Sequence, residues 1–183
     1  MAGRDLSERE RAIAPSRSDT SEPDADPESV ARAIALRMLE RQPRTRAELA
    51  RGMARRGVPA DAAAAVLDRF TEVGLIDDEA FAAAWVDSRH AGRGLGRRAL
   101  SAELRRRGVD DSVVRETVAT VSDEDEATAA RALVRRKLAT MQRLPQETQQ
   151  RRLVAMLARK GFGQGLAMQV VREALAGVEA AAD

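Results

Sequence analysis

The chain has 183 residues, of which 44% are hydrophobic but only 2% aromatic, and 33% are charged, with a formal net charge of +2. Because it contains no cysteine, disulfide bonds, thiolate catalysis and cysteine-ligated zinc are excluded. No apolar run is long enough to span a membrane, and the N-terminus lacks the apolar segment of a signal peptide. We therefore expect a cytoplasmic protein without a membrane partner.

The first 28 residues differ in composition from the remainder. They are rich in Pro, Ser and Asp and hold four arginines against eight acidic residues. Such a segment buries too little apolar surface to offset the entropy lost on ordering. The composition predicts a disordered, acidic N-terminal tail over residues 1–28.

Helical signals begin next to this tail. Asp26 followed by Pro27 is typical of an N-cap and a first helical residue. A capping-box spacing from Thr45 to Glu48 opens a second helix, and Gly57 is placed to end it. A third amphipathic helix follows, so residues 29–75 are predicted to form a three-helix repeat.

A second set of helical signals covers residues 76–121. Asp77 or Asp78 is expected to cap a helix on which Phe81 and Trp85 lie one turn apart. The two aromatic residues could stack on nucleic-acid bases. Their alanine-rich surroundings favour a role in the core of this unit.

Glycines divide the second repeat. Gly92, Gly94 and Gly96 predict a loop that ends its first helix. The next helix carries inward-facing leucines and ends at a further glycine, in the order Leu100, Leu104 and Gly108. A third helix, capped by Asp110 or Asp111, completes the unit.

The same pattern recurs a third time in residues 122–183. Leu49, Leu100 and Leu153 occupy one repeat position, and the helix-ending glycines Gly57, Gly108 and Gly161 occupy another. A unit of this size buries its apolar face poorly on its own, whereas stacked units bury it well. The sequence therefore predicts an all-α fold, an elongated array of three tandem three-helix repeats that resemble helix-turn-helix units.

Basic residues recur at one repeat position. The pairs immediately before the three glycines are Arg55–Arg56, Arg106–Arg107 and Arg159–Lys160. Cations near a helix C-terminus stabilise the helix, which accounts for one such pair per helix. Seven arginines against one acidic residue between Arg89 and Arg107 exceed that need. A basic stripe along the array is typical of surfaces that bind phosphate backbones or acidic proteins, although a solvated face paired with acidic bands is an alternative.

Residues suited to catalysis are scarce. His90 is the only histidine and lies among arginines at a predicted helix end, where the helix dipole favours it. The aspartate pairs at 77–78 and 110–111 precede helices, so capping explains them better than metal binding or acid–base chemistry. The glycine-rich loop follows a helix and lacks a Walker lysine. We expect no enzyme activity, no cofactor and no metal.

The central block resembles the RecX family of recombinase regulators. The matching stretches are GLIDDEAFA (74–82), WVDSR (85–89), GRGLG (92–96) and LSAELRRRGV (100–109). Their order and spacing are specific, and the resemblance extends loosely from about residue 30 to 176, weakest in the third unit. It implies a non-enzymatic modulator that binds the RecA filament on single-stranded DNA and limits its growth, ATPase, strand exchange and co-protease activity. Many members of the family also bind DNA.

The resemblance supplies no list of contact residues, so the expected contacts come from the basic positions. They are Arg89, Arg93, Arg97 and Arg98, supported by Arg106 and Arg107 and by the equivalent pairs Arg55–Arg56 and Arg159–Lys160, together with the glycine-rich loop. We expect a monomer. A different class of function, a stand-alone helix-turn-helix DNA-binding module, remains an alternative, although its presumed recognition helices contain few base-reading side chains.

Overall fold

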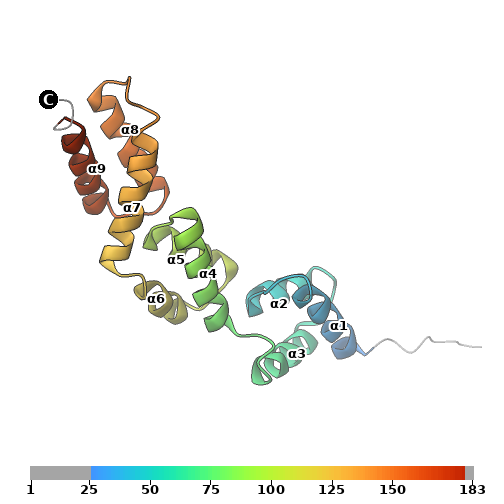
Figure 1. Cartoon of the computed structure of the whole chain (residues 1–183). Coiled ribbons are helices and arrows are strands. Elements are labelled where there is room, and N and C mark those ends of the chain that lie inside the picture. Colours follow the sequence, from blue (N-terminus) through green and yellow to red (C-terminus); the bar gives the residue numbers. More distant parts are fainter. Residues whose placement is uncertain (1–25, 180–183) are drawn as a thin grey trace, which may run out of the picture.

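The computed structural model describes residues 26–179, and nine α-helices and no strand lie in this part of the chain. The first unit contains α1 (Pro27–Leu39), α2 (Arg46–Ala54) and α3 (Ala60–Glu72). The second contains α4 (Asp78–Arg93), α5 (Arg97–Arg107) and α6 (Asp111–Ala119). The third contains α7 (Asp123–Leu138), α8 (Gln146–Arg159) and α9 (Gln164–Glu179). Extensive helix–helix contacts occur only within a unit, and the three units follow one another in an elongated array (Figure 1).

Each unit has its own hydrophobic core. The equivalent leucines Leu49, Leu100 and Leu153 are fully buried, one in each core. Small residues such as Ala31 and Ala82 are also fully buried and let the first helix of a unit approach the others closely. The all-α fold and the three tandem repeats predicted from the sequence are confirmed.

Several predicted helix boundaries are confirmed by their caps. The Asp26 carboxylate accepts hydrogen bonds from the backbone N–H groups of Glu28 and Ser29, and Thr45 and Glu48 form a complete capping box. Asp77 and Asp110 cap α4 and α6. The hydroxyl groups of Ser29 and Ser112, and after them their backbone N–H groups, donate to Asp26 and Asp110 and lower the pKa of these two carboxyl groups. Capping is therefore the observed role of Asp77 and Asp110.

Two expectations need adjustment. The predicted loop at 92–96 is shorter than expected, because α4 continues through Gly92 to Arg93 and Gly94 ends it in the left-handed conformation, with φ 57°. A glycine in the last turn costs a helix little, so only residues 94–96 form the loop. The predicted tail lies outside the described residues except for its last three, of which Pro27 and Glu28 begin α1.

Candidate functional site

The middle helices of successive units meet end to end. The C-terminal end of α8 lies against the N-terminal end of α5, where the N–H groups of Gly96 and Arg98 donate to the carbonyls of Lys160 and Gly161 at 2.9 and 3.3 Å. These N–H groups have no acceptor within their own helix. Unit 3 thus caps the middle helix of unit 2.

Arg97 strengthens this second junction. Its backbone N–H and its Nε donate to the carboxylate of Glu126 at 2.9 and 2.8 Å, and its guanidinium also bonds Asp123. Glu126 is only 6% exposed, so its charge is satisfied almost entirely by Arg97. The hydrogen bonds to Asp123 and then Glu126 raise the pKa of Arg97. Arg97, one of the expected contact residues, therefore joins units 2 and 3.

The junction between units 1 and 2 has the same geometry. The Thr45 hydroxyl, at the start of α2, donates to the carbonyl of Arg107, at the end of α5, at 2.8 Å. The N–H of Arg46 donates to the Asp78 carboxylate at 2.9 Å. Burial raises the pKa of Asp78, although this hydrogen bond opposes the shift. Asp78 thus accepts a hydrogen bond from the start of α2 in the neighbouring unit, while Asp77 caps its own helix, α4.

The aromatic pair lies beside this first junction. Phe81 and Trp85 are stacked with ring centroids 5.7 Å apart, and both pack against the core of unit 2, as predicted, while remaining partly exposed. The Arg107 guanidinium lies 3.7 Å from the Trp85 ring centroid and donates to Glu48 of unit 1 at 2.6 Å. Arg107 therefore links an aromatic face of one unit to a carboxylate of the other.

Arg89 is held on the same aromatic platform. Its guanidinium lies 4.0 Å from the Trp85 ring centroid and forms an ion pair with Glu103 at 3.7 Å. Trp85 Nε1 donates to the same Glu103 carboxylate at 2.9 Å. Like Arg97 and Arg107, Arg89 is engaged within the protein.

Other expected contact residues face solvent. Arg93, Arg98 and Arg106 are exposed, and the latter two line a groove of about 670 Å³ that α5 forms with α8 and α9. Arg159 lies at the same groove. Lys160 is less free, because its Nζ donates to the Arg93 carbonyl at 2.5 Å. The structure brings Arg98, Arg106 and Arg159 together at one surface.

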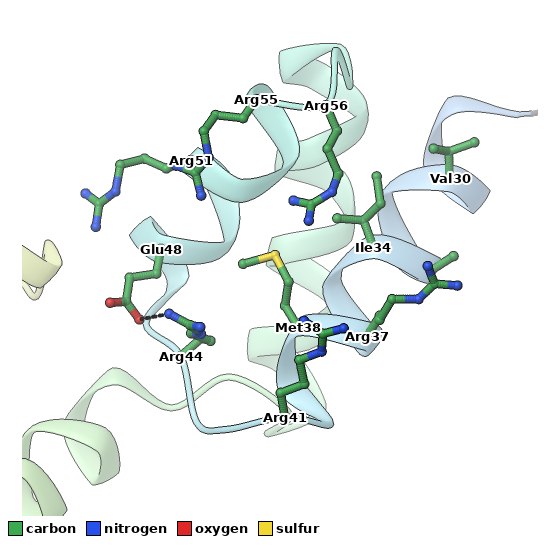
Figure 2. A pocket seen from close by; sticks show the side chains of 11 residues that line it. Val30, Ile34, Arg37, Met38, Arg41, Arg44, Glu48, Arg51, Arg55 and Arg56 are labelled. Carbon is green, nitrogen blue, oxygen red and sulfur yellow. Dashed lines mark ion pairs between the residues drawn. The ribbon is translucent and has the colours of Figure 1, made fainter.

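A second basic groove lies in unit 1 and contains Arg55 and Arg56, the two residues of this unit that the sequence predicts as contacts. It is lined by six arginines from α1, the segment between α1 and α2, α2 itself and the turn after α2. They are Arg37, Arg41, Arg44, Arg51, Arg55 and Arg56. Figure 2 shows Arg56 pointing from the end of α2 toward α1. The spacing of Arg37 from Arg41 and of Arg51 from Arg55, one helical turn each, is the signal that could have located this groove.

Among residues 26–179 no cluster of His, Asp and Glu could hold a metal ion. The Nδ1 atom of His90 lies 2.9 Å from the Leu95 carbonyl, so this histidine is part of the turn that ends α4. No helix in the described part of the chain is long and apolar enough to cross a membrane.

The end-to-end units and their arginine-lined grooves define an all-helical tandem-repeat protein with basic surface grooves. Three family models match it in order: the first three-helix domain of RecX at residues 31–70, the second at 77–118 and the third at 123–171. The chain therefore belongs to the RecX family of regulatory proteins.

Relatives agree with this assignment, and a solved structure shows the same fold. The chain is 58% identical over 145 residues to the regulatory protein RecX of Thermobifida fusca, covering 79% of this chain and 78% of the relative. It is 51% identical over 164 residues to the RecX of Streptomyces coelicolor, covering 90% and 87%. The crystal structure of RecX from Lactobacillus salivarius superposes with a TM-score of 0.74 at 20% identity, covering 81% of this chain and 97% of that one, and supports the fold.

Proposed function

We propose that this protein binds the RecA filament on single-stranded DNA and lowers its growth, ATPase, strand exchange and co-protease activity, without catalysing a reaction itself. The observation that carries the proposal is the array of three separately cored units whose exposed surface holds arginine-lined grooves. Linked units that each make modest contacts achieve high avidity on a repeating polymer. Membership of the RecX family supports the same conclusion.

The proposed contacts are the exposed arginines of the second and third units, Arg93, Arg98, Arg106 and Arg159. Their side chains are free to pair with phosphates or carboxylates. Arg89 is paired inside unit 2, with Glu103, whereas Arg97 and Arg107 form ion pairs between units that hold the geometry of the array. These two arginines set the spacing of the contact surfaces.

The test is co-sedimentation with RecA assembled on single-stranded DNA, combined with inhibition of the RecA ATPase. Reversing Arg93, Arg98 and Arg106 to Glu together should weaken inhibition at least tenfold and leave helicity unchanged. The matched control reverses three exposed arginines of unit 3, Arg136, Arg151 and Arg172. Absence of wild-type co-sedimentation would contradict the function, whereas undiminished inhibition by the first variant would contradict only the contact surface.

Two measurements distinguish a stand-alone DNA-binding module from the proposed function. They are the salt dependence of DNA binding and its dependence on RecA. Binding carried by phosphate contacts falls steeply with the logarithm of the salt concentration and needs no recombinase. Direct DNA contact through the exposed arginines is part of the proposal, as an addition to RecA binding. Nanomolar, sequence-specific binding to duplex DNA without RecA would favour the alternative.

A further inference from the structure

The groove between α1 and α2 in unit 1 combines a basic rim with an apolar floor. It has a volume of about 690 Å³ and an open mouth lined by the six arginines named above. Val30, Ile34 and Met38, one turn apart on α1, form the floor (Figure 2). Val30 is 37% exposed, so the floor is accessible.

Unit 2 shows how an equivalent groove is filled. The 51-residue repeat places Val30, Ile34 and Met38 at the positions of Phe81, Trp85 and Arg89. In unit 2 the two aromatic rings occupy the floor. The Glu103 carboxylate, on the middle helix, accepts from Trp85 and pairs with Arg89. In unit 2 the groove is thus occupied by side chains of the same unit, a carboxylate and two aromatic rings.

Unit 1 lacks both. The residue equivalent to Glu103 is Gly52, which is buried under the end of the Met38 side chain. Arg56 lies over this position, since its Nη1 donates to the Gly52 carbonyl at 2.8 Å. The one acidic residue that lines the groove, Glu48, is already paired with Arg44 at 3.8 Å and with Arg107 of unit 2 at 2.6 Å. The groove therefore carries positive charge without a carboxylate to match it.

The apolar floor indicates whether the groove fits a nucleic-acid phosphate backbone or an acidic protein segment. A phosphate backbone is bound by cations alone, and bases stack on aromatic rings, none of which line this groove. A protein segment that presents carboxylates beside an apolar side chain would match both the arginine rim and the Val30–Ile34 floor. Charge and apolar surface together favour a protein ligand.

We propose that the α1–α2 groove of unit 1 docks an acidic segment of a partner protein, whose carboxylates meet Arg37, Arg41 and Arg55 and whose apolar side chain lies on Val30 and Ile34. The inference rests on the proposed function, because it assigns this segment to the protein component of the RecA filament. The contact arginines of units 2 and 3, Arg93, Arg98, Arg106 and Arg159, remain available to the DNA.

The sharpest test replaces Gly52 by Glu, which gives unit 1 the carboxylate that unit 2 has at the equivalent position, Glu103. A Cβ at Gly52 would lie 2.5 Å from Sδ and Cε of Met38, the far end of a flexible side chain that can move aside. Gly52→Glu should therefore occupy the groove and weaken co-sedimentation with RecA on single-stranded DNA about tenfold. Gly52→Gln fills the same space without charge and should weaken it about threefold or less. Equal binding by wild type, Gly52→Glu and Gly52→Gln would overturn the inference.

Two further variants change exposed residues of the rim and the floor, and so leave the packing of the helices intact. Arg37→Gln, Arg41→Gln and Arg55→Gln together, or Val30→Gln alone, should each weaken filament binding at least fivefold. They should alter binding to a naked oligothymidylate less than twofold. The control replaces Arg136, Arg151 and Arg172 by Gln, which gives the same charge change on exposed positions of unit 3. Binding to the filament should then change less than twofold.

The outcomes separate the inference from the proposed function. If the wild-type chain does not co-sediment with the filament, both fail. If all variants bind the filament like the wild type, only the groove assignment fails. An equal loss of naked oligothymidylate binding would assign the groove to phosphates, and a self-association that Gly52→Glu abolishes would assign it to a second copy of this chain. Either result overturns the proposal.

Discussion

The two junctions between units use the same end-to-end arrangement but cap the receiving helix differently. At the first, α2 carries its own capping box of Thr45 and Glu48, and unit 2 adds hydrogen bonds from outside it. At the second, the N-cap residue of α5 is Gly96, which provides no side-chain cap. Its first N–H groups are satisfied by Lys160, Gly161 and Glu126 of unit 3.

This difference makes unit 2 more dependent on unit 3 than unit 1 is on unit 2. A helix that caps itself keeps its first turn when the neighbour is lost, whereas orphaned N–H groups destabilise it. Backbone-to-backbone contact also requires that no side chain intervene. Gly96 and Gly161 meet this condition, because a Cβ on Gly96 would lie 2.7 Å from the Gly161 carbonyl oxygen.

The largest expected effect comes from adding one methyl group at the second junction. Gly161 has φ 85°, and a Cβ there would lie 2.3 Å from the Ala99 backbone nitrogen. Gly161→Ala combines left-handed strain with a backbone clash, and should lower the free energy of unfolding by about 3 kcal/mol. Urea denaturation followed by circular dichroism measures the change.

Gly57 provides the matched control for this variant. It occupies the equivalent repeat position at the free end of α2, with φ 76° and nothing within 4 Å of an added Cβ. Gly57→Ala should therefore cost only the backbone strain, about 1 kcal/mol. Equal losses in the two variants would mean that the close approach at Gly161 contributes nothing.

The next effect concerns the ion pair of the second junction. Arg97→Ala removes the guanidinium from the buried Glu126 and leaves its carboxylate with one backbone N–H. Because the Arg97 side chain is 34% exposed, water screens part of the interaction, and we expect a loss of about 2 kcal/mol in the free energy of unfolding. The exposed neighbour Arg98 is the control: Arg98→Ala should change stability by less than about 0.5 kcal/mol.

A double variant tests the mechanism of that loss. Replacing Glu126 by Gln in the Arg97→Ala background removes the unpaired buried charge, so part of the stability should return. A double variant no more stable than Arg97→Ala would show that the buried charge is not the cause.

The sequence was sufficient to predict the fold because local signals agree with the repeat. The capping box at Thr45, the caps at Asp77 and Asp110, and the terminating glycine Gly57 all act within a few residues of their partners. The extent of α4 and the end of the N-terminal tail, of which Pro27 and Glu28 belong to α1, were misjudged. Gly92 resembles a helix terminator in sequence, but Gly94, two residues later, adopts the left-handed conformation that ends the helix.

The roles of the arginines could not be predicted, because their partners are distant in the chain. Arg107 is 59 residues from Glu48, and Arg97 is 29 residues from Glu126. Repeat position alone does not separate a junction arginine from an exposed one. The correspondence of Glu103 with Gly52 could be seen in the sequence, but its meaning depends on the contacts of Trp85 and Arg89.

The smallest effect is expected at the first junction, where the receiving helix caps itself. Thr45 is fully buried, and its hydroxyl accepts from the Glu48 N–H at 3.1 Å while donating to the Arg107 carbonyl. Thr45→Val keeps the shape but removes both hydrogen bonds, and should lower the free energy of unfolding by about 1.5 kcal/mol. Thr45→Ser keeps the hydroxyl and should lose about half as much or less. Amide hydrogen exchange should rise at the start of α2 and stay unchanged in α8, since the second junction does not contain this hydroxyl; faster exchange throughout unit 3 would contradict the independence of the two junctions.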